Sequence, residues 1–411
     1  MPSEFSIKRL LPLYIVIFFG FLGYSMMITL FTPLFMYAQE GMVSVDSSIG
    51  YRVILLGIVL ALFPLAQFFS SPILGALSDH FGRRPILLIS LYSAPVCYAL
   101  IAFSLTFHSI ALLMLGCFIA GITQANIVVA QSAIVDIAPR EERNRLFGYI
   151  YLSASSAYIA GPLLGGKLTN SSTVSWFDYP TPFWVVCGFL VVVLFWTQAV
   201  FLETKKEKGI HVNYLGAFVS LLTIFTSRRL RKIYFINFLL YIAIFGYFRC
   251  YPMYIVNAFH VNASKLSEYI AWVAVPIVLV NLGVTSVLSK RFSPKILTIW
   301  ASFFTGVFML LIVIPDAQAA LWVTLFLTSA ALALSLPSSS TMLSFAASPA
   351  EQGLVMGNNQ SLQVAAEALS AFAGGLLASI SIAMPLVVMS LVACITGIIL
   401  FSVRKSIPDH H

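Results

Sequence analysis

The stretch GALSDHFGRRP occupies residues 75–85 and separates two long apolar runs. It contains Asp79, Arg83 and Arg84, whose charges are costly to place in hydrocarbon. The stretch therefore predicts a short polar loop at a membrane surface. Because Lys and Arg gather in cytoplasmic loops, the two arginines also predict that this surface is the cytoplasmic one.

The composition of the whole chain agrees with a membrane protein. Apolar residues make up 60% of the 411 residues and charged residues only 9%, whereas soluble domains average about 25% charged residues. A helix needs about 20 apolar residues to cross the hydrocarbon core. Twelve runs meet or approach this length: 9–36, 50–74, 86–105, 109–137, 146–168, 182–202, 233–257, 268–289, 295–314, 319–346, 354–380 and 383–403. The sequence therefore predicts an all-α polytopic membrane protein with twelve transmembrane helices.

The distribution of basic residues predicts the topology. If the N-terminus is cytoplasmic, nineteen of the 23 Lys and Arg residues fall in cytoplasmic segments, and only Arg52, Lys167, Arg249 and Lys265 lie elsewhere. Both termini are therefore expected on the cytoplasmic side. The net charge of +8 follows from these loops, and no basic groove interleaved with aromatic residues is visible. We therefore expect no nucleic-acid partner.

A basic segment at 205–232 divides the chain. It begins and ends with clusters of Lys and Arg, and the apolar stretch between them is too short to span a membrane. We predict an N-terminal six-helix bundle at 1–204, a cytoplasmic connector with an interfacial segment at 205–232, and a C-terminal six-helix bundle at 233–411.

The two predicted bundles show weak internal similarity. Residues 139–166 match 349–375, with Gly148 aligned to Gly357 and the pair 165–166 aligned to 374–375, each at a spacing of 209. The stretch LSKRFSPK at 288–295 looks like a degenerate copy of LSDHFGRR at 77–84. These matches indicate a duplicated six-helix unit.

The stretch 75–85 closely resembles the signature between helices 2 and 3 of the major facilitator superfamily of transporters. The signature positions are filled by Gly75, Asp79, Gly82, Arg83 and Arg84, and His80 is the visible departure. The resemblance implies two six-helix bundles around a central cavity. It also implies transport by alternating access.

The fifth apolar run carries a second motif of this family, the antiporter motif G-x8-G-x3-G-P-x2-G-G. Its positions hold Gly148, Ala157, Gly161, Pro162, Gly165 and Gly166, with Ala157 in place of one glycine. Small residues on one face let helices approach closely, and the proline removes one backbone donor. The resemblance implies a role in switching between inward and outward states. The alternative is an ordinary packing face of small residues.

The fourth run and the loop after it resemble the tetracycline/proton antiporters of the drug:proton branch. This resemblance implies that Asp136 pairs with the arginines of the 75–85 loop, that Asp79 faces a helix N-terminus of the other half, and that these contacts hold one conformation closed. Alternatively, these charges only anchor the topology. Cys117 stands where the family usually has an arginine, and the first run lacks a buried acid, which weakens the interpretation as a cation exporter.

Two ionisable residues lie deep in apolar runs. Glu367 is near the middle of the eleventh run and Arg249 lies two-thirds along the seventh. Such residues are rare in membranes and mark substrate or proton pathways by default. We predict that Glu367 couples transport to protons and that Arg249 binds substrate. The alternative is a fixed ion pair that only stabilises the C-terminal bundle.

Several amide side chains on these runs are further candidates for substrate binding: Gln124, Asn126, Asn281, Asn359 and Gln363. Amides hydrogen-bond to solutes, but they also join helices with about 0.6–2 kcal/mol each. Each of these residues is therefore a candidate for either role.

The sequence predicts a proton-coupled secondary transporter of a small organic solute, with export by antiport favoured by the resemblance and an anionic or zwitterionic substrate favoured by Arg249. The alternatives are uptake of a carboxylate-rich metabolite, such as a siderophore or organic acid, and a non-transporting receptor of the same fold. No catalytic constellation, metal-ligand spacing or nucleotide loop is visible, so neither an enzyme nor a cofactor is expected. We expect a monomer in a bacterial inner membrane whose partners are the solute, protons and lipid.

Overall fold

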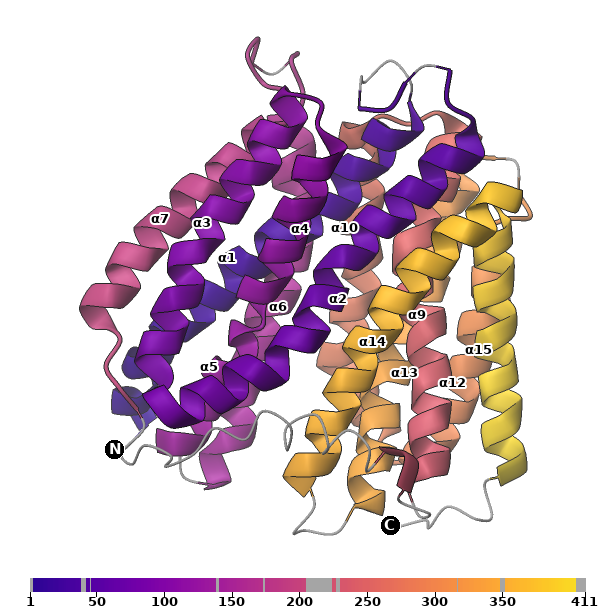
Figure 1. The fold of residues 1–411 in the computed structure, drawn as a ribbon. Coiled ribbons are helices and arrows are strands. Elements are labelled where there is room, and N and C mark those ends of the chain that lie inside the picture. Colours follow the sequence, from indigo (N-terminus) through magenta and orange to yellow (C-terminus); the bar gives the residue numbers. More distant parts are fainter. Residues whose placement is uncertain are drawn as a thin grey trace. The chain divides into compact units, whose positions relative to one another are not determined.

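The computed structural model describes residues 3–37, 42–44, 46–137, 140–172, 174–204, 224–226, 230–315, 317–347 and 352–403. All regular structure in this part of the chain is helical (Figure 1). The helices of the first half are α1 (Ser3–Met36), α2 (Ile49–Phe81), α3 (Arg83–Thr106), α4 (Ile110–Gln124), α5 (Asn126–Ile137), α6 (Arg140–Leu168) and α7 (Thr181–Val200). Those of the second half are α9 (Arg231–Phe259), α10 (Ala263–Leu279), the π-helical turn η2 (Val280–Val284), α11 (Thr285–Leu288), α12 (Pro294–Leu310), α13 (Ala320–Ala346), α14 (Gln352–Ile380) and α15 (Met384–Val403).

The helices confirm the predicted fold class. Within the described ranges, ten helical segments are long and apolar enough to cross a membrane. The ninth predicted run forms α12, which is apolar but only 17 residues long. The fifth forms α6, whose first turn is the polar sequence REER. All twelve predicted runs therefore coincide with helices of the structure.

The described chain forms two compact units. Unit 1 comprises Met1–Val45 and Leu62–Phe218, and unit 2 comprises Asp46–Ala61 and Val219–His411. Helix α2 therefore begins in unit 2 and ends in unit 1, whereas the sequence assigned the whole helix to the first bundle. Most of the predicted connector at 205–232 lies outside the described residues.

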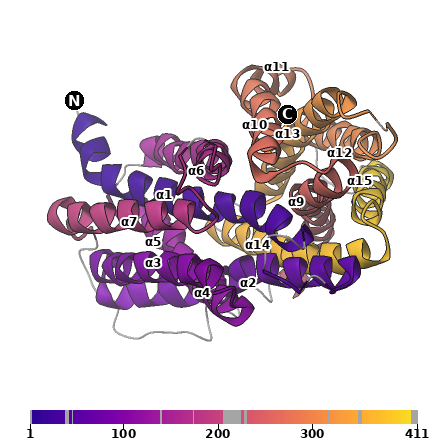
Figure 2. The ribbon, with the colours of Figure 1, turned by 90° about the horizontal axis from the view of Figure 1, so that it is seen from above.

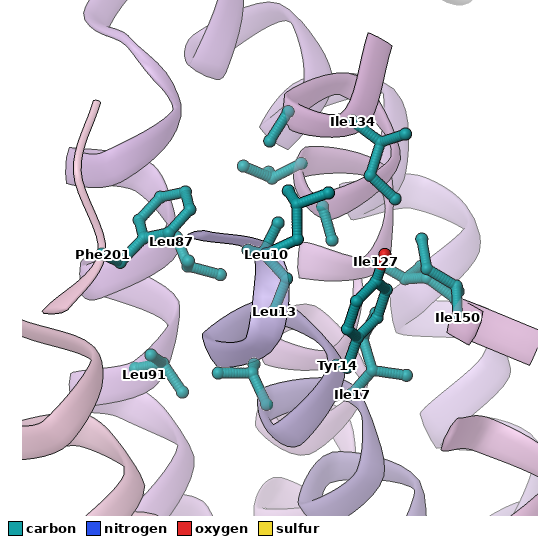
Figure 3. Packing of buried hydrophobic residues seen from close by; sticks show 14 of the residues in the cluster. Leu10, Leu13, Tyr14, Ile17, Leu87, Leu91, Ile127, Ile134, Ile150 and Phe201 are labelled. Atoms are coloured by element: carbon teal, nitrogen blue, oxygen red, sulfur yellow. The ribbon is translucent and has the colours of Figure 1, made fainter. Parts of the chain in front are cut away.

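Unit 1 is organised around α1 and α3. Helix α1 packs along α6 and also touches α7, while α3 contacts both α4 and α7 (Figure 2). Figure 3 shows the apolar cluster where α1, α3, α5 and α6 meet, with Leu13, Leu87, Ile134 and Ile150 among its buried side chains. The hydroxyl of Tyr14 donates to the carbonyl of Leu146 at 3.3 Å inside this cluster. Because lipid is as apolar as these side chains, close packing and such hydrogen bonds hold the helices together.

Unit 2 is organised around α9 and α12. Helix α9 contacts α14 and α15, and α12 contacts α13 and α15 (Figure 1). The first part of α2 joins this unit through a glycine contact with α14. A Cβ atom on Gly57 would lie 2.8 Å from both the carbonyl oxygen of Ala371 and the Cα of Gly375. Glycine at this position therefore allows the two backbones to meet.

Two of the predicted single helices are interrupted. The run 109–137 is divided at Ala125, whose N–H bonds to the carbonyls of Ile122 and Thr123 in a tightened turn. The run 268–289 contains the π-helical turn η2, where the hydroxyl of Thr285 donates to the carbonyl of Val280 at 3.0 Å. Local apolar content did not reveal either interruption, since a run stays apolar whether or not its hydrogen-bond ladder is regular.

Candidate functional site

The predicted loop at 75–85 is a turn of one residue between two helices. Helix α2 continues to Phe81, and α3 begins at Arg83. Gly82 joins them with φ +102°, a backbone conformation that side chains with a Cβ rarely adopt. The turn therefore brings Asp79, Arg83 and Arg84 to one end of unit 1.

Arg83 is the centre of a charged cluster at this end. Its Nε lies 2.8 Å from Oδ2 of Asp136 on α5, and its Nη2 lies 2.9 Å from Oδ1 of Asp79 on α2. Nη1 donates to the hydroxyl of Ser78 at 2.6 Å. The pairing of Asp136 with the loop, which the family resemblance implied, is therefore present with Arg83. The gating role of the cluster stays a prediction.

Glu203 completes this cluster, and the sequence reasoning missed it. The residue follows α7, and its carboxylate accepts the backbone N–H of Arg83 at 2.9 Å and of Arg84 at 3.1 Å. These are the first amides of α3, where unpaired donors and the helix dipole favour an anion. The side chain of Arg84 donates to the carbonyl of Gln198 at 2.8 Å. The acid directly after the sixth apolar run was the available signal, but only folding shows which helix it caps.

The charged cluster thus connects four helix ends of unit 1, namely those of α2, α3, α5 and α7. It also includes Thr204, the last residue before the predicted connector, whose hydroxyl donates to Asp136 at 3.5 Å. Side-chain exposure differs across it: Asp79 is 60% exposed and Asp136 only 19%. Since solvent screens exposed pairs, the Asp136 contact is expected to hold Arg83 more strongly than the Asp79 contact.

The small residues of the predicted antiporter motif let α6 approach α1. A Cβ atom on Gly161 would collide with the side chain of Ser25 and lie 2.7 Å from the carbonyl of Leu22. One on Gly165 would lie 3.2 Å from Met26. The hydroxyl of Ser25 also donates to the carbonyl of Ala157 at 3.1 Å. The remaining motif residues described within α6 are Pro162 and the buried Gly166.

The small residues of α6 therefore pack closely on α1, as the alternative interpretation of the motif expected. Its switching role stays a prediction. Gly148 lies in α6, but its surroundings are outside what the structure describes. Gly75 of the first signature lies on α2, where a Cβ atom would lie 3.4 Å from the side chain of Val128 on α5.

Arg249 and Glu367 form an ion pair in unit 2, the contact that the sequence offered as the alternative to roles in substrate and proton binding. Nη2 of Arg249 on α9 lies 2.5 Å from Oε1 of Glu367 on α14. The arginine side chain is 1% exposed and the carboxylate 13%. Stacked rings of Tyr247 and Tyr251, with centroids 4.8 Å apart, lie on the same helix as the arginine. The structure therefore brings together the two residues that the sequence placed on different helices.

This pair stands out in the charge inventory of the membrane helices. Among the described helical spans, other Asp, Glu, Lys and Arg residues lie near helix ends, such as Lys265 and Glu268 in the first turns of α10. Arg249 and Glu367 alone lie well inside a described span. An ion pair at this depth costs desolvation energy, so a functional role is the default expectation.

The two amides on the fourth span flank the turn between α4 and α5. Gln124 is 4% exposed and Asn126 is 5% exposed. Within the described chain, Nε2 of Gln124 and Oδ1 of Asn126 have no hydrogen-bond partner. Buried polar atoms are usually paired, so this turn keeps unused hydrogen-bonding capacity inside unit 1.

The three amides of unit 2 differ in their surroundings. The Oδ1 of Asn359 accepts from Asn237 at 3.3 Å and from Tyr241 at 3.0 Å, and its Nδ2 donates to Ser340 at 3.5 Å. Asn359 therefore joins α9, α13 and α14, which favours a structural role. Asn281 is exposed on the π-helical turn, and Gln363 is half-buried one turn before Glu367 on α14.

Comparison with known proteins identifies the family. The model of the Major Facilitator Superfamily matches residues 13–287 and 233–410. The chain belongs to this family of transporters, and it is an integral membrane protein.

Tetracycline resistance proteins are among its relatives. The class H protein of Pasteurella multocida is 38% identical over 157 residues, which are 38% of the chain and 37% of that protein. The match thus spans little more than a third of that relative's length. The class D protein of Salmonella ordonez is 30% identical over 311 residues, which are 73% of the chain and 74% of that protein. These matches place the chain beside the tetracycline-antiporter-like branch that the motifs predicted.

A solved structure supports the fold. The human organic anion transporter MFSD10 superposes with a TM-score of 0.71 and 18% sequence identity, covering 96% of this chain and 99% of that one. At this identity the likeness shows the shared fold.

Proposed function

We propose that the chain is a proton-coupled secondary transporter that moves a small organic solute by alternating access. The family and the tetracycline resistance relatives support proton-coupled export as the leading direction. The Arg249–Glu367 pair is the observation that carries the proposal, since Glu367 is a carboxylate deep in a membrane helix that can accept a proton. The positive-inside pattern supports a bacterial inner membrane with both termini in the cytoplasm.

The proposed solute is anionic or zwitterionic. Arg249 supplies a cation inside unit 2, and the human structural relative is an organic anion transporter, which is compatible with this charge. Gln124 and Asn126 supply unpaired hydrogen-bonding atoms, with Asn281 and Gln363 as further polar contacts. Asn359 is the weakest of the proposed substrate ligands, because its amide is engaged by neighbouring helices.

The charged cluster around Arg83 is the proposed cytoplasmic gate. Its contacts join helix ends rather than the interior of one helix, so they can open without unfolding a span. A non-transporting receptor of the same fold would not need these contacts together with a buried proton acceptor. Transport is therefore the better supported class.

A second candidate is proton-coupled uptake of a carboxylate-rich solute, such as a siderophore or organic acid. The observation that favours it is the Arg249–Glu367 ion pair, in which the guanidinium already binds a carboxylate. A solute carboxylate can take the place of Glu367 when that residue is protonated.

The test is transport by the purified protein in liposomes with an imposed proton gradient. Internal pH is followed after addition of tetracycline or p-aminohippurate, for wild type, Glu367→Gln and the control Glu268→Gln. The control changes a carboxylate that is 51% exposed at the start of α10. Solute-dependent proton flux in wild type and the control, but not in Glu367→Gln, supports the proposal. Equal flux in all three proteins removes Glu367 from the proton path.

A further inference from the structure

The turn before α12 joins exposed positive charge to an exposed apolar face. We infer that this part of unit 2 binds an anionic phospholipid, with the lipid phosphate at Lys290 and Arg291 and the acyl chains along the outer face of α12. The residues proposed for transport lie elsewhere, so lipid binding at this surface is a property additional to the proposed function.

The turn lies in the stretch LSKRFSPK at 288–295, which resembles LSDHFGRR at 77–84. In the earlier stretch, Asp79 and Arg83 form an ion pair at 2.9 Å. Their counterparts in the later stretch are Lys290 and Pro294, so a basic residue takes the place of the acid. The later stretch therefore carries positive charge without an acid of its own.

Backbone hydrogen bonds hold the two cations in a tight turn. The carbonyl of Leu288, the last residue of α11, accepts the N–H of Arg291 at 3.0 Å and the N–H of Phe292 at 2.9 Å. The side chains of Lys290 and Arg291 are exposed, and within the described chain neither forms an ion pair. The turn therefore presents two positive charges to its surroundings.

Acidic residues are scarce near this turn. The described acids of unit 2 are Asp46, Glu268 and Glu367. Asp46 precedes α2, Glu268 lies in the first turns of α10, and Glu367 lies inside α14. Lys295, the next basic residue, is 6% exposed and therefore belongs to the packed side of α12. A negatively charged group from outside the described chain thus fits the exposed pair of cations.

One face of α12 is apolar and exposed. Ile296, Trp300 and Phe304 follow one another at intervals of four residues and are 42%, 55% and 42% exposed. The rings of Trp300 and Phe304 stack with centroids 6.0 Å apart, and Phe304 stacks on Phe308 at 5.7 Å. Side chains four residues apart lie on the same side of a helix, so these residues form one strip. The other side of α12 packs on α13 and α15, which leaves the strip for acyl chains.

The length of α12 places the turn near the lipid phosphates. The helix has 17 residues, which at 1.5 Å per residue span about 25 Å. The hydrocarbon core is about 30 Å thick, so α12 cannot extend beyond both of its boundaries. The turn before α12 then lies where acyl chains meet headgroups, and long basic side chains reach the phosphates from this depth.

Headgroup charge decides between the classes of lipid. A zwitterionic headgroup carries its own cation, which the two basic side chains repel. An anionic headgroup such as that of phosphatidylglycerol brings the phosphate without a cation. Because each basic residue near anionic lipid favours binding by about fivefold, the pair should prefer phosphatidylglycerol by at least this factor.

The start of α7 offers a matched surface without exposed cations. Trp184 lies in the first turn of this helix, is 39% exposed and contacts the ring of Phe103. The charged residue that precedes the helix is an acid, Asp178, whose carboxylate accepts from the backbone N–H of Thr181 at 3.1 Å. Lipid beside Trp184 should therefore show no preference for negative charge.

The test is quenching of tryptophan fluorescence by brominated lipids in nanodiscs that hold the whole protein. Brominated phosphatidylglycerol is compared with brominated phosphatidylcholine, and the signal of Trp300 is the difference between wild type and Trp300→Phe. Phosphatidylglycerol should be favoured at Trp300 by about fivefold or more. The preference should shrink in about 1 M salt, where the Debye length falls to about 3 Å. The signal of Trp184, obtained in the same way with Trp184→Phe, should not distinguish the lipids.

Three results of this experiment overturn the inference. The first is equal quenching of Trp300 by the two lipids at low salt. The second is an equal preference for phosphatidylglycerol at Trp184, since the attraction would then belong to the net charge of the protein. The third is the absence of quenching of Trp300 by either lipid, which is expected if a second copy of the chain covers the strip.

Two double variants test the cations directly. Lys290→Gln with Arg291→Gln removes both charges and should abolish the lipid preference at Trp300. Lys290→Arg with Arg291→Lys keeps both charges and should retain it. Because the changed side chains are exposed, both proteins should unfold at the wild-type temperature. A preference that survives the loss of both charges, or that disappears in the exchanged variant, contradicts the inference. Transport in liposomes is not a readout of these experiments, so failure of the proposed function would leave their results unchanged.

Discussion

The two units use arginine in opposite ways. In unit 1, Arg83 sits at a helix end between Asp79, Asp136 and Ser78, in a cluster open to solvent on the Asp79 side. In unit 2, Arg249 lies inside a span and faces Glu367 in a closed pair. An exposed pair such as Asp79–Arg83 contributes about 0.2–1 kcal/mol, so in unit 1 a weak exposed contact stands beside the better shielded Asp136–Arg83 contact. Removing one partner of a buried pair costs about 3–5 kcal/mol, so the stability of unit 2 depends strongly on this single contact.

The largest expected effect is that of removing the carboxylate in unit 2. Glu367→Ala should lower the free energy of unfolding by about 3–5 kcal/mol, because the buried Arg249 loses the carboxylate with which it forms its ion pair. It should also abolish solute-dependent proton flux. Thermal unfolding in detergent and the liposome assay measure the two effects.

A double variant separates charge from packing at this pair. Arg249→Met combined with Glu367→Ala removes both charges and should recover much of the lost stability. If Glu367→Ala unfolds like wild type, another group compensates the charge of Arg249. The loss of one carboxylate would then not affect the stability of unit 2 more than that of unit 1.

The second prediction concerns the packing of the first part of α2 on α14 inside unit 2. A Cβ atom on Gly50 would lie 3.5 Å from the Cβ of Ser379 on α14, a separation that suits a disulfide. In a background without native cysteines, Gly50→Cys with Ser379→Cys should crosslink on oxidation and stop transport, because the proposed alternating access requires the first part of α2 to separate from α14.

Reduction should restore transport in this crosslinked protein, and each single variant should remain active under oxidant. Crosslinking is verified by mass spectrometry of the digested protein. Full transport by verified crosslinked protein means that the first part of α2 stays with unit 2 throughout the cycle.

The third prediction tests the helix cap in unit 1. Glu203→Ala removes the acceptor for the amides of Arg83 and Arg84, and should lower unfolding free energy by about 0.5–2 kcal/mol. High salt should shrink the difference, since the helix end interacts with a charge. Unfolding curves at two salt concentrations measure this, with Glu268→Ala as a control outside the cluster. An unchanged curve would show that the cap carries no net stability.

The smallest effect is expected at the exposed edge of the same cluster. Asp79→Asn should change stability by about 0–1 kcal/mol, because Asp79 is 60% exposed. Asp136→Asn should cost more, since the side chain of Asp136 is 19% exposed and accepts from Nε of Arg83 at 2.8 Å and from Nη2 at 3.4 Å. The reverse order in unfolding experiments would show that solvent exposure does not rank these two contacts.

Individual residues show where the sequence sufficed for prediction. The break between two helices near 75–85 was predictable because charges interrupt apolar runs, but the turn is the single residue Gly82 rather than an eleven-residue loop. The Asp136–Arg83 contact followed from family resemblance. The Arg249–Glu367 pair was one of two alternatives that the sequence offered, because two opposite charges inside apolar runs can pair with each other or serve substrate and proton. The cap by Glu203 was not, since an acid after an apolar run shows no preference for a particular helix end.

The sequence by itself determined that the chain is an integral membrane protein, where its helices lie, and which residues carry charge inside them. These properties are local, because about 20 consecutive apolar residues suffice to form a span. The tertiary structure alone decided that Asn359 is engaged between helices, that the span of α4 and α5 breaks at Ala125, and that α2 begins in unit 2. Those outcomes depend on how side chains and glycine faces fit between helices far apart in the chain, and apolar content along one helix carries no record of that fit.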